Sequence, residues 1–127
     1  MRVVLDTCVL IPTPIRLILL GLAESDLFFP LWSEKIIEEW EFFVSKNKSD
    51  AIAKTRIEIL LMNSKWKKSM VPSDTKLEER LFLPDRNDRH VFASAIIGQA
   101  QLVLTNNLKD FPSKILGKYN IAPRSVD

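Results

Sequence analysis

The sequence predicts an α/β fold in which a mainly parallel sheet is covered by helices on both faces, and three observations support this prediction. First, short apolar runs without polar alternation are typical of strands buried on both faces. Second, these runs alternate along the chain with longer segments of helical spacing, as in parallel sheets. Third, 127 residues with 46% hydrophobic and 27% charged side chains suit one domain with a single core.

The first part of the chain is expected to form two strands and one helix. Residues 3–5 are a short buried strand, and residues 27–31 are a second one. The helix between them runs from about residue 14 to residue 23. Thr13 caps it, and Pro14 occupies the first helical position, where its missing N–H costs nothing.

Two longer helices are expected next. Ser33 caps a helix that runs to about Lys46, and Asp50 caps another over residues 51–64. The first helix has a buried stripe at helical spacing, formed by Ile36, Trp40, Phe43 and Val44. The second has one apolar face, formed by Ile57, Leu60 and Leu61.

The remaining elements are shorter. Residues 70–71 are expected to form a brief strand and residues 76–81 a short helical piece. The turn at 83–88 opens a helix over residues 88–99. Residues 102–105 are the next strand, and Ser113 caps a last helix that reaches Tyr119.

Composition restricts the class of protein. No apolar run is long enough to span a membrane, so no membrane partner is expected. Asp6 interrupts the first apolar run before it could serve as the core of a signal peptide. Cys8 is the only cysteine, which excludes an internal disulfide and fits a reducing compartment. We therefore expect a cytoplasmic protein.

The net charge of +2 does not by itself indicate nucleic-acid binding. Basic residues are nevertheless concentrated in the middle of the chain, around Trp66. The commoner meaning of such a run is a solvated helix face. The alternative is contact with the phosphates of a substrate backbone, and the candidates for this are Lys65, Lys67 and Lys68.

Four carboxylates lie where strands and helices are expected to begin or end. They are Asp6, Glu39, Asp88 and Asp110. In parallel sheets, ligands bind beyond the carboxyl ends of the strands, where these acids are expected to meet. Each one taken alone is also explained as a cap, a turn residue or a half-exposed glutamate. Asp85 competes with Asp88 for the cap, and Glu38 and Glu41 are alternatives to Glu39.

Several acids at one edge suggest a divalent cation. Mg²⁺ prefers carboxylate oxygens and keeps several waters. One or two such ions polarise a phosphoryl oxygen and activate water for hydrolysis. Polar neighbours that could hydrogen-bond a phosphate or a coordinated water are Thr7, Thr105 and Asn107.

At these residues the chain resembles the PIN-domain family. Residues 5–10, Leu-Asp-Thr-Cys-Val-Leu, are similar to its first motif, which usually reads Asp-Thr-Asn-Val-Leu. Residues 33–40 resemble the second motif and place its glutamate at Glu39. Residues 83–95 resemble the third, with its key aspartate at Asp88, and residues 104–112 the fourth. The motifs occur in the expected order.

The resemblance implies a three-layer α/β/α sandwich and a Mg²⁺- or Mn²⁺-dependent endoribonuclease that leaves a 5′-phosphate. It points to the toxin of a bacterial toxin–antitoxin pair, which an antitoxin protein inhibits and which often forms a homodimer. Carried over to this chain, the catalytic and metal-binding acids are Asp6, Glu39, Asp88 and Asp110, with Asn107 sharing the fourth metal-binding position.

The chain departs from the family pattern at three places. Cys8 replaces the usual asparagine, which removes a hydrogen bond near the metal. Asn107 stands where many members have aspartate, which lowers the negative charge of the site. The chain stops soon after the fourth motif, so a single domain over residues 1–127 is expected to lack a last strand or helix.

Other classes of protein fit these residues less well. A phospho-receiver domain needs a second acid after Asp6, and a haloacid-dehalogenase-like phosphatase needs one in place of Cys8. A thiol hydrolase built on Cys8 and His90 fits only in residue type. The main alternative is a PIN-like module with weak catalysis that binds RNA or protein. Its contact residues, which equally suit a core, would be Ile57, Leu60, Leu61, Met62 and Trp66.

Overall fold

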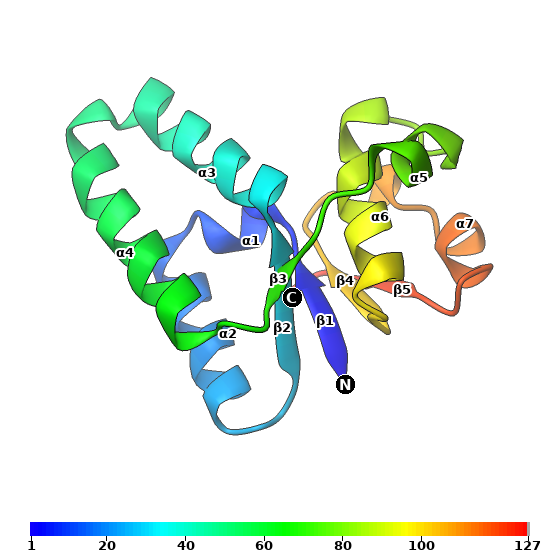
Figure 1. Cartoon of the computed structure of the whole chain (residues 1–127), viewed down its shortest axis with the longest axis horizontal. Helices are drawn as coiled ribbons and strands as arrows, with labels where there is room; N and C mark the ends of the chain where they lie inside the picture. Colours follow the sequence, from blue (N-terminus) through cyan, green and yellow to red (C-terminus); the bar gives the residue numbers. More distant parts are fainter. Residues whose placement is uncertain (127) are drawn as a thin grey trace.

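The computed structural model describes residues 1–126, which form a five-stranded parallel sheet with helices on both faces (Figure 1). The strand order is β3-β2-β1-β4-β5, and every neighbouring pair is parallel. The predicted fold class is therefore confirmed. The strands are β1 (Arg2–Leu5), β2 (Phe29–Ser33), β3 (Met70–Val71), β4 (Leu102–Leu104) and β5 (Ala122–Arg124).

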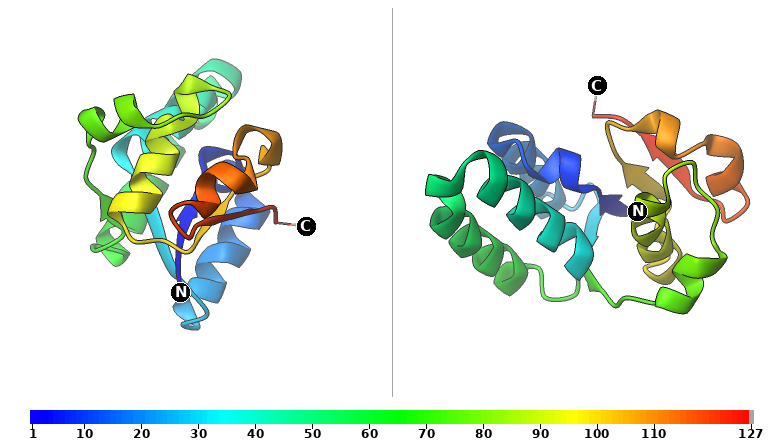
Figure 2. Two further views of the ribbon diagram at one scale, coloured as in Figure 1. Left: turned by 90° about the vertical axis from the view of Figure 1, so that its right-hand side faces the viewer. Right: turned by 90° about the horizontal axis from the view of Figure 1, so that it is seen from above.

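Helices α1 to α4 lie on one side of the sheet and α5 to α7 on the other (Figures 1 and 2). No helix within residues 1–126 is both long and apolar enough to cross a bilayer. The α-helices are α1 (Thr7–Leu10), α2 (Thr13–Glu24), α3 (Glu34–Asn47), α4 (Ile52–Lys65), α5 (Thr75–Arg80), α6 (Arg89–Ile97) and α7 (Ser113–Gly117). Three 3₁₀ turns join them, η1 (Ser49–Ala51), η2 (Arg86–Asp88) and η3 (Leu108–Asp110).

The carboxyl ends of the central strands are held side by side. The backbone N–H of Asp6 donates to the carbonyl of Leu104 at 3.1 Å, which fixes the end of β1 against the end of β4. Ser33 ends β2 and accepts a hydrogen bond from Ile36 N, so β2 passes directly into α3. The residues that follow β1, β2 and β4 therefore lie at one edge of the sheet.

Two strands differ from the sequence-based prediction. β2 begins at Phe29 rather than at residue 27, because Asp26 has a left-handed φ of 62° and the chain is still turning there. β5 was not predicted, since Ala-Pro-Arg contains no apolar run. Pro123 is tolerated because β5 is an edge strand.

The predicted caps are correct in part. Ser33 caps α3 as expected. Asp50 instead lies in η1, so Ala51 precedes α4. The predicted caps Thr13 and Ser113 are the first helical residues, each preceded by a proline at the cap position.

The apolar face predicted for α4 is on the wrong side of the helix. Ile57, Leu60 and Leu61 are 58%, 69% and 65% exposed, whereas Ile59 and Met62 are buried. Apolar residues occur around most of this helix, so spacing alone did not show which face packs against α3. Phe43 on α3 is likewise exposed in part, although it was expected in the buried stripe.

This assignment of the α4 faces predicts small mutational effects on the exposed side. Leu60→Ser is expected to change the free energy of unfolding by less than about 0.5 kcal/mol, as exposed substitutions usually do. Ile59→Val, which removes one buried methyl group on the same helix, is expected to cost about 1 kcal/mol. Urea unfolding of both variants checks the prediction, and a larger loss for Leu60→Ser would contradict it.

A buried arginine joins the helices on this side of the sheet. Arg16 is 5% exposed, and its Nη1 donates to the carbonyls of Leu10 and Ile11 at 2.7 and 3.1 Å. Its Nη2 contacts Glu58 of α4 at 2.5 Å, and its guanidinium lies 4.8 Å from the ring centre of Trp40 on α3. Burial lowers the pKa of Arg16, and Glu58 opposes this effect.

Candidate functional site

Asp6 lies at the centre of the carboxyl edge, directly after β1. Its side chain caps α1, because Oδ1 accepts from Thr7 N at 2.8 Å. Oδ2 accepts from the hydroxyl of Thr105 at 2.8 Å and lies 3.7 Å from the thiol of Cys8. Burial raises the pKa of Asp6, while these hydrogen bonds lower it. Asp6 is thus both a helix cap and a carboxylate of fixed orientation.

Glu39 is brought to Asp6 by the direction of α3. The hydroxyl of Thr7, the neighbour of Asp6, lies 3.0 Å from Glu39 Oε1 and 3.2 Å from the carbonyl of Ile36. The competing Glu41 instead pairs with Arg56 at 3.2 Å. Of the three glutamates considered, Glu39 is therefore the one that contacts the surroundings of Asp6.

Asp88 ends η2 and carries no capping hydrogen bond. Asp85 has that role, since its carboxylate accepts from Asn87 N at 2.9 Å. Burial and then the negative charges of Asp6, Asp85, Asp110 and Glu39 raise the pKa of Asp88 to about 6. The other three predicted acids therefore lie within electrostatic reach of Asp88.

The loop after β4 is tied to α1 by Thr105 and Cys8. Thr105 is fully buried, and its hydroxyl accepts from Asn107 N at 3.1 Å. Cys8 Sγ accepts from Asn106 N at 3.3 Å and lies 3.6 Å from Thr105 Oγ1. Cys8 thus supplies a contact at the position where the usual asparagine is missing. The side chain of Asn107 itself is exposed.

The contacts of Cys8 do not favour the thiol-hydrolase alternative. Burial and the charge of Asp6 raise the pKa of its thiol, which disfavours the thiolate nucleophile. Its hydrogen-bond partners are Asp6, Thr105 and Asn106, whereas His90 contacts Glu39.

His90 also contacts the candidate site, although the sequence predicted a role for it only in the thiol-hydrolase alternative. Its Nε2 lies 3.2 Å from Glu39 Oε1, and its side chain is only 10% exposed. Its Nδ1 is buried without a hydrogen-bond partner among residues 1–126. The position of His90, two residues after Asp88 on the helix that starts there, was the only signal in the sequence.

The carboxylate oxygens of these acids are the type of ligand that a divalent cation such as Mg²⁺ prefers. Within residues 1–126, no three His, Cys, Asp or Glu side chains are arranged so that they could together hold a metal ion. Mg²⁺, however, commonly uses one or two carboxylates and completes its coordination with water. The carboxylate of Asp88 makes no hydrogen bond or ion pair in the part of the chain described. Its pKa is raised by burial and then by crowded negative charge, which a cation would offset.

The three lysines proposed to contact substrate lie apart from the acids. Lys65 pairs with Glu24, the last residue of α2. The chain turns from there toward the start of β2, away from the carboxyl ends of the strands. Lys67 and Lys68 are exposed in the turn before β3. No hydrogen bond or ion pair within residues 1–126 joins these lysines to the acid cluster, so their contact with substrate stays a prediction.

Comparison with known proteins gives two findings. A family model described as PIN domain matches residues 2–109. The crystal structure of VapBC2 from Rickettsia felis, bound to a DNA fragment from their promoter, contains a chain of similar fold. The TM-score is 0.68 at 22% sequence identity, and the alignment covers 100% of both chains. A search of curated proteins found no match.

Proposed function

Because this chain belongs to the PIN-domain family, we propose that it is a Mg²⁺- or Mn²⁺-dependent endoribonuclease and the toxin of a toxin–antitoxin pair. One observation carries the proposal: Asp6, Glu39, Asp88 and Asp110 come from distant segments, yet three of them raise the pKa of Asp88 at the carboxyl edge of the sheet. Such clustering of like charge is unfavourable for folding alone and is typical of a functional site.

The residues of the site have separate roles in this proposal. The cation would be held by one or two of the carboxylates of Asp6, Glu39, Asp88 and Asp110, and by the others and Asn107 through coordinated water. When bound, such a cation would polarise the scissile phosphate and lower the pKa of the attacking water, so that hydroxide would be available at neutral pH. Thr105 and the N–H of Thr7 keep the Asp6 carboxylate in one orientation before substrate arrives. The Thr7 hydroxyl and His90 do the same for Glu39.

The proposal is tested by removing and restoring the metal. Protein stripped with EDTA is expected to leave single-stranded RNA intact, and excess Mg²⁺ or Mn²⁺ is expected to restore cleavage to products with 5′-phosphates. The metal should also raise the unfolding temperature, since a ligand at 100 times its Kd stabilises the folded state by about 2.7 kcal/mol. Cleavage that persists in EDTA would contradict the mechanism. Metal and RNA binding without cleavage would instead support the binding-module alternative.

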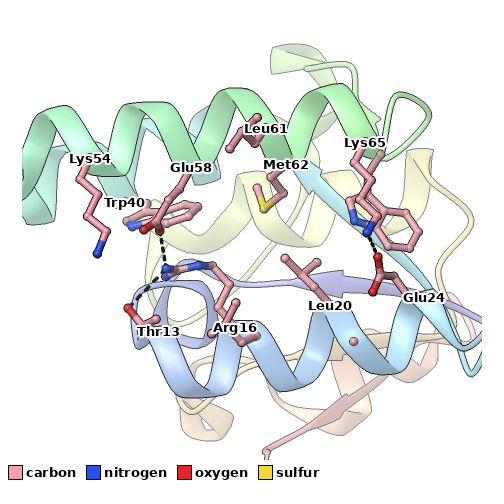
Figure 3. Close-up of a pocket in the computed structure, with 13 residues that line it drawn as sticks. Thr13, Arg16, Leu20, Glu24, Trp40, Lys54, Glu58, Leu61, Met62 and Lys65 are labelled. Carbon is pink, nitrogen blue, oxygen red and sulfur yellow. Dashed lines mark hydrogen bonds and ion pairs between the residues drawn. The ribbon is translucent and has the colours of Figure 1, made fainter.

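A groove between α2 and α4 supports the proposed antitoxin partner (Figure 3). It has a volume of about 540 Å³. Leu17 of α2 and Leu61 of α4 lie on its rim and are 63% and 65% exposed. Facing rows of apolar residues on two helices are the usual receptor for an amphipathic helix. We place the inhibitory segment of the antitoxin here, beside the Arg16–Glu58 pair that also holds the end of α1.

A further inference from the structure

A second groove, with a volume of about 670 Å³, adjoins the acid cluster. Two of its lining residues, Glu39 and His90, already belong to the candidate site. A molecule in this groove therefore lies against Glu39. The groove is lined by Lys35, Glu38, Glu39, Phe42, Asn87 and His90.

Phe42 is the one aromatic side chain that lines this groove. It follows Glu39 by three residues on α3, so the two side chains are neighbours on one helix face. Its ring is 64% exposed, although a phenylalanine side chain gains free energy by leaving water. Lys46 Nζ lies 5.5 Å from the ring centre, which places a positive charge beside an aromatic face.

The surroundings of Phe42 suit a nucleic-acid strand better than a protein. A docking helix needs several apolar contacts in a row, as the groove between α2 and α4 provides. The groove at Phe42 instead surrounds a single large apolar side chain with charged and polar groups. An exposed aromatic platform is the usual arrangement for single-stranded nucleic acid, because bases stack on the ring. The cation beside the ring is Lys46, whereas Lys35 pairs with Glu78 at 2.6 Å and the acids Glu38 and Glu39 also line the groove.

We propose that Phe42 is the stacking platform for a base of the RNA substrate next to the phosphate that is cleaved. An RNA strand extends to either side of its scissile phosphate, and Glu39 of the candidate site is one of the residues that line this groove. Asn87 offers an exposed amide that can donate to or accept from the edge of the stacked base. This inference rests on the proposed function. It adds a contact to a base of the substrate, whereas the acids act on the scissile phosphate.

The platform restricts the substrate to unpaired nucleotides. A base that stacks on a protein ring must leave the stack of its own helix, and recognition of single-stranded RNA commonly uses such splayed bases. Double-stranded RNA of the same sequence is therefore expected to be bound and cleaved poorly.

The test compares the affinity of Phe42 variants for a short, dye-labelled single-stranded RNA in EDTA, by fluorescence anisotropy. Phe42→Ala is expected to raise the Kd about 5- to 150-fold, which corresponds to the range for one stacked base. Phe42→Trp, which keeps a stacking ring, is expected to restore binding, whereas Phe42→Leu is not. Phe82→Ala is the matched control, since Phe82 is 71% exposed and does not line the groove.

The outcomes separate this inference from the proposed function. If Phe42→Ala binds RNA as the parent does while the parent still cleaves with Mn²⁺, the platform is wrong and the nuclease proposal stands. If Phe42→Ala loses affinity for RNA but the parent never cleaves, the platform stands and the nuclease proposal fails. A parent that binds no single-stranded RNA overturns the platform. A change of oligomeric mass in Phe42→Ala with unchanged RNA affinity would also overturn it and assign Phe42 to a contact between proteins.

Discussion

Replacing Asp88 with asparagine is expected to reduce RNA cleavage more than about a hundredfold and, at the same time, to stabilise the metal-free protein. Loss of a residue that merely supports a metal ligand costs 10- to 100-fold in affinity or activity, so loss of a ligand is expected to exceed that range. The carboxylate of Asp88 makes no hydrogen bond or ion pair within residues 1–126 that asparagine would disturb. Its negative charge is instead repelled by the negative charges of Asp6, Asp85, Asp110 and Glu39.

The stabilising effect follows from the raised pKa of Asp88. In the folded protein this pKa is about 6, against 3.8 for the ordinary side chain. Between these values the folded state binds more protons than the unfolded state, so stability falls as the pH rises from about 4 to 6. The shift corresponds to almost 3 kcal/mol. Since the side chain is only half-buried, solvent screening reduces the expected gain for Asp88→Asn at pH 7 to about 1 kcal/mol.

Urea unfolding in EDTA at pH 4.5 and 7, together with RNA cleavage in Mn²⁺, measures both effects. Asp50→Asn makes the same chemical change at an exposed position in η1 and serves as the control. The variant at Asp88 should gain stability over the parent at pH 7 but little at pH 4.5, and the control should gain none. Cleavage by Asp88→Asn at the parental rate would show that Asp88 does not hold the metal.

The sequence predicted the parts of the site that follow from the phase of single elements. The end of an apolar run marks Asp6, and the motif in residues 33–40 marks Glu39, while Glu38 and Glu41 stayed open as alternatives. Both signals lie within one segment. The contact of His90 with Glu39 depends on how α6 is rotated against α3. The bond between Cys8 and Asn106 depends on the register of β1 against β4. Neither relation is encoded within a single segment.

The same limit explains the errors in the fold. α4 carries apolar residues on two faces, and only its packing against α3 shows that Ile59 is buried and Leu60 is exposed. β5 forms because its backbone pairs with β4, although its own residues are a weak strand sequence. No pattern in the sequence singles out Arg16, yet it is buried because four backbone and side-chain partners surround it.

Replacing Arg16 with methionine is expected to lower the free energy of unfolding by about 3 kcal/mol. The methionine fills much of the space but leaves the carbonyls of Leu10 and Ile11 without their donor, and each unpaired buried group costs about 1–3 kcal/mol. The loss stays below the upper range for a broken buried ion pair, because the Glu58 side chain is 31% exposed and water can solvate it.

Arg56→Met is the matched control for this substitution. Arg56 also joins α4 to α3, through Glu41 at 3.2 Å, but its side chain is 63% exposed. An exposed pair of this kind contributes at most about 1 kcal/mol. In urea unfolding, the free energies of unfolding of the two variants should therefore differ by about 2 kcal/mol. Equal losses would show that the burial of Arg16 does not increase the stability of the protein. Because Arg16 holds the end of the short helix that begins at Asp6, a folded Arg16→Met protein should also bind Mn²⁺ more weakly, whereas Arg56→Met should bind it as the parent does.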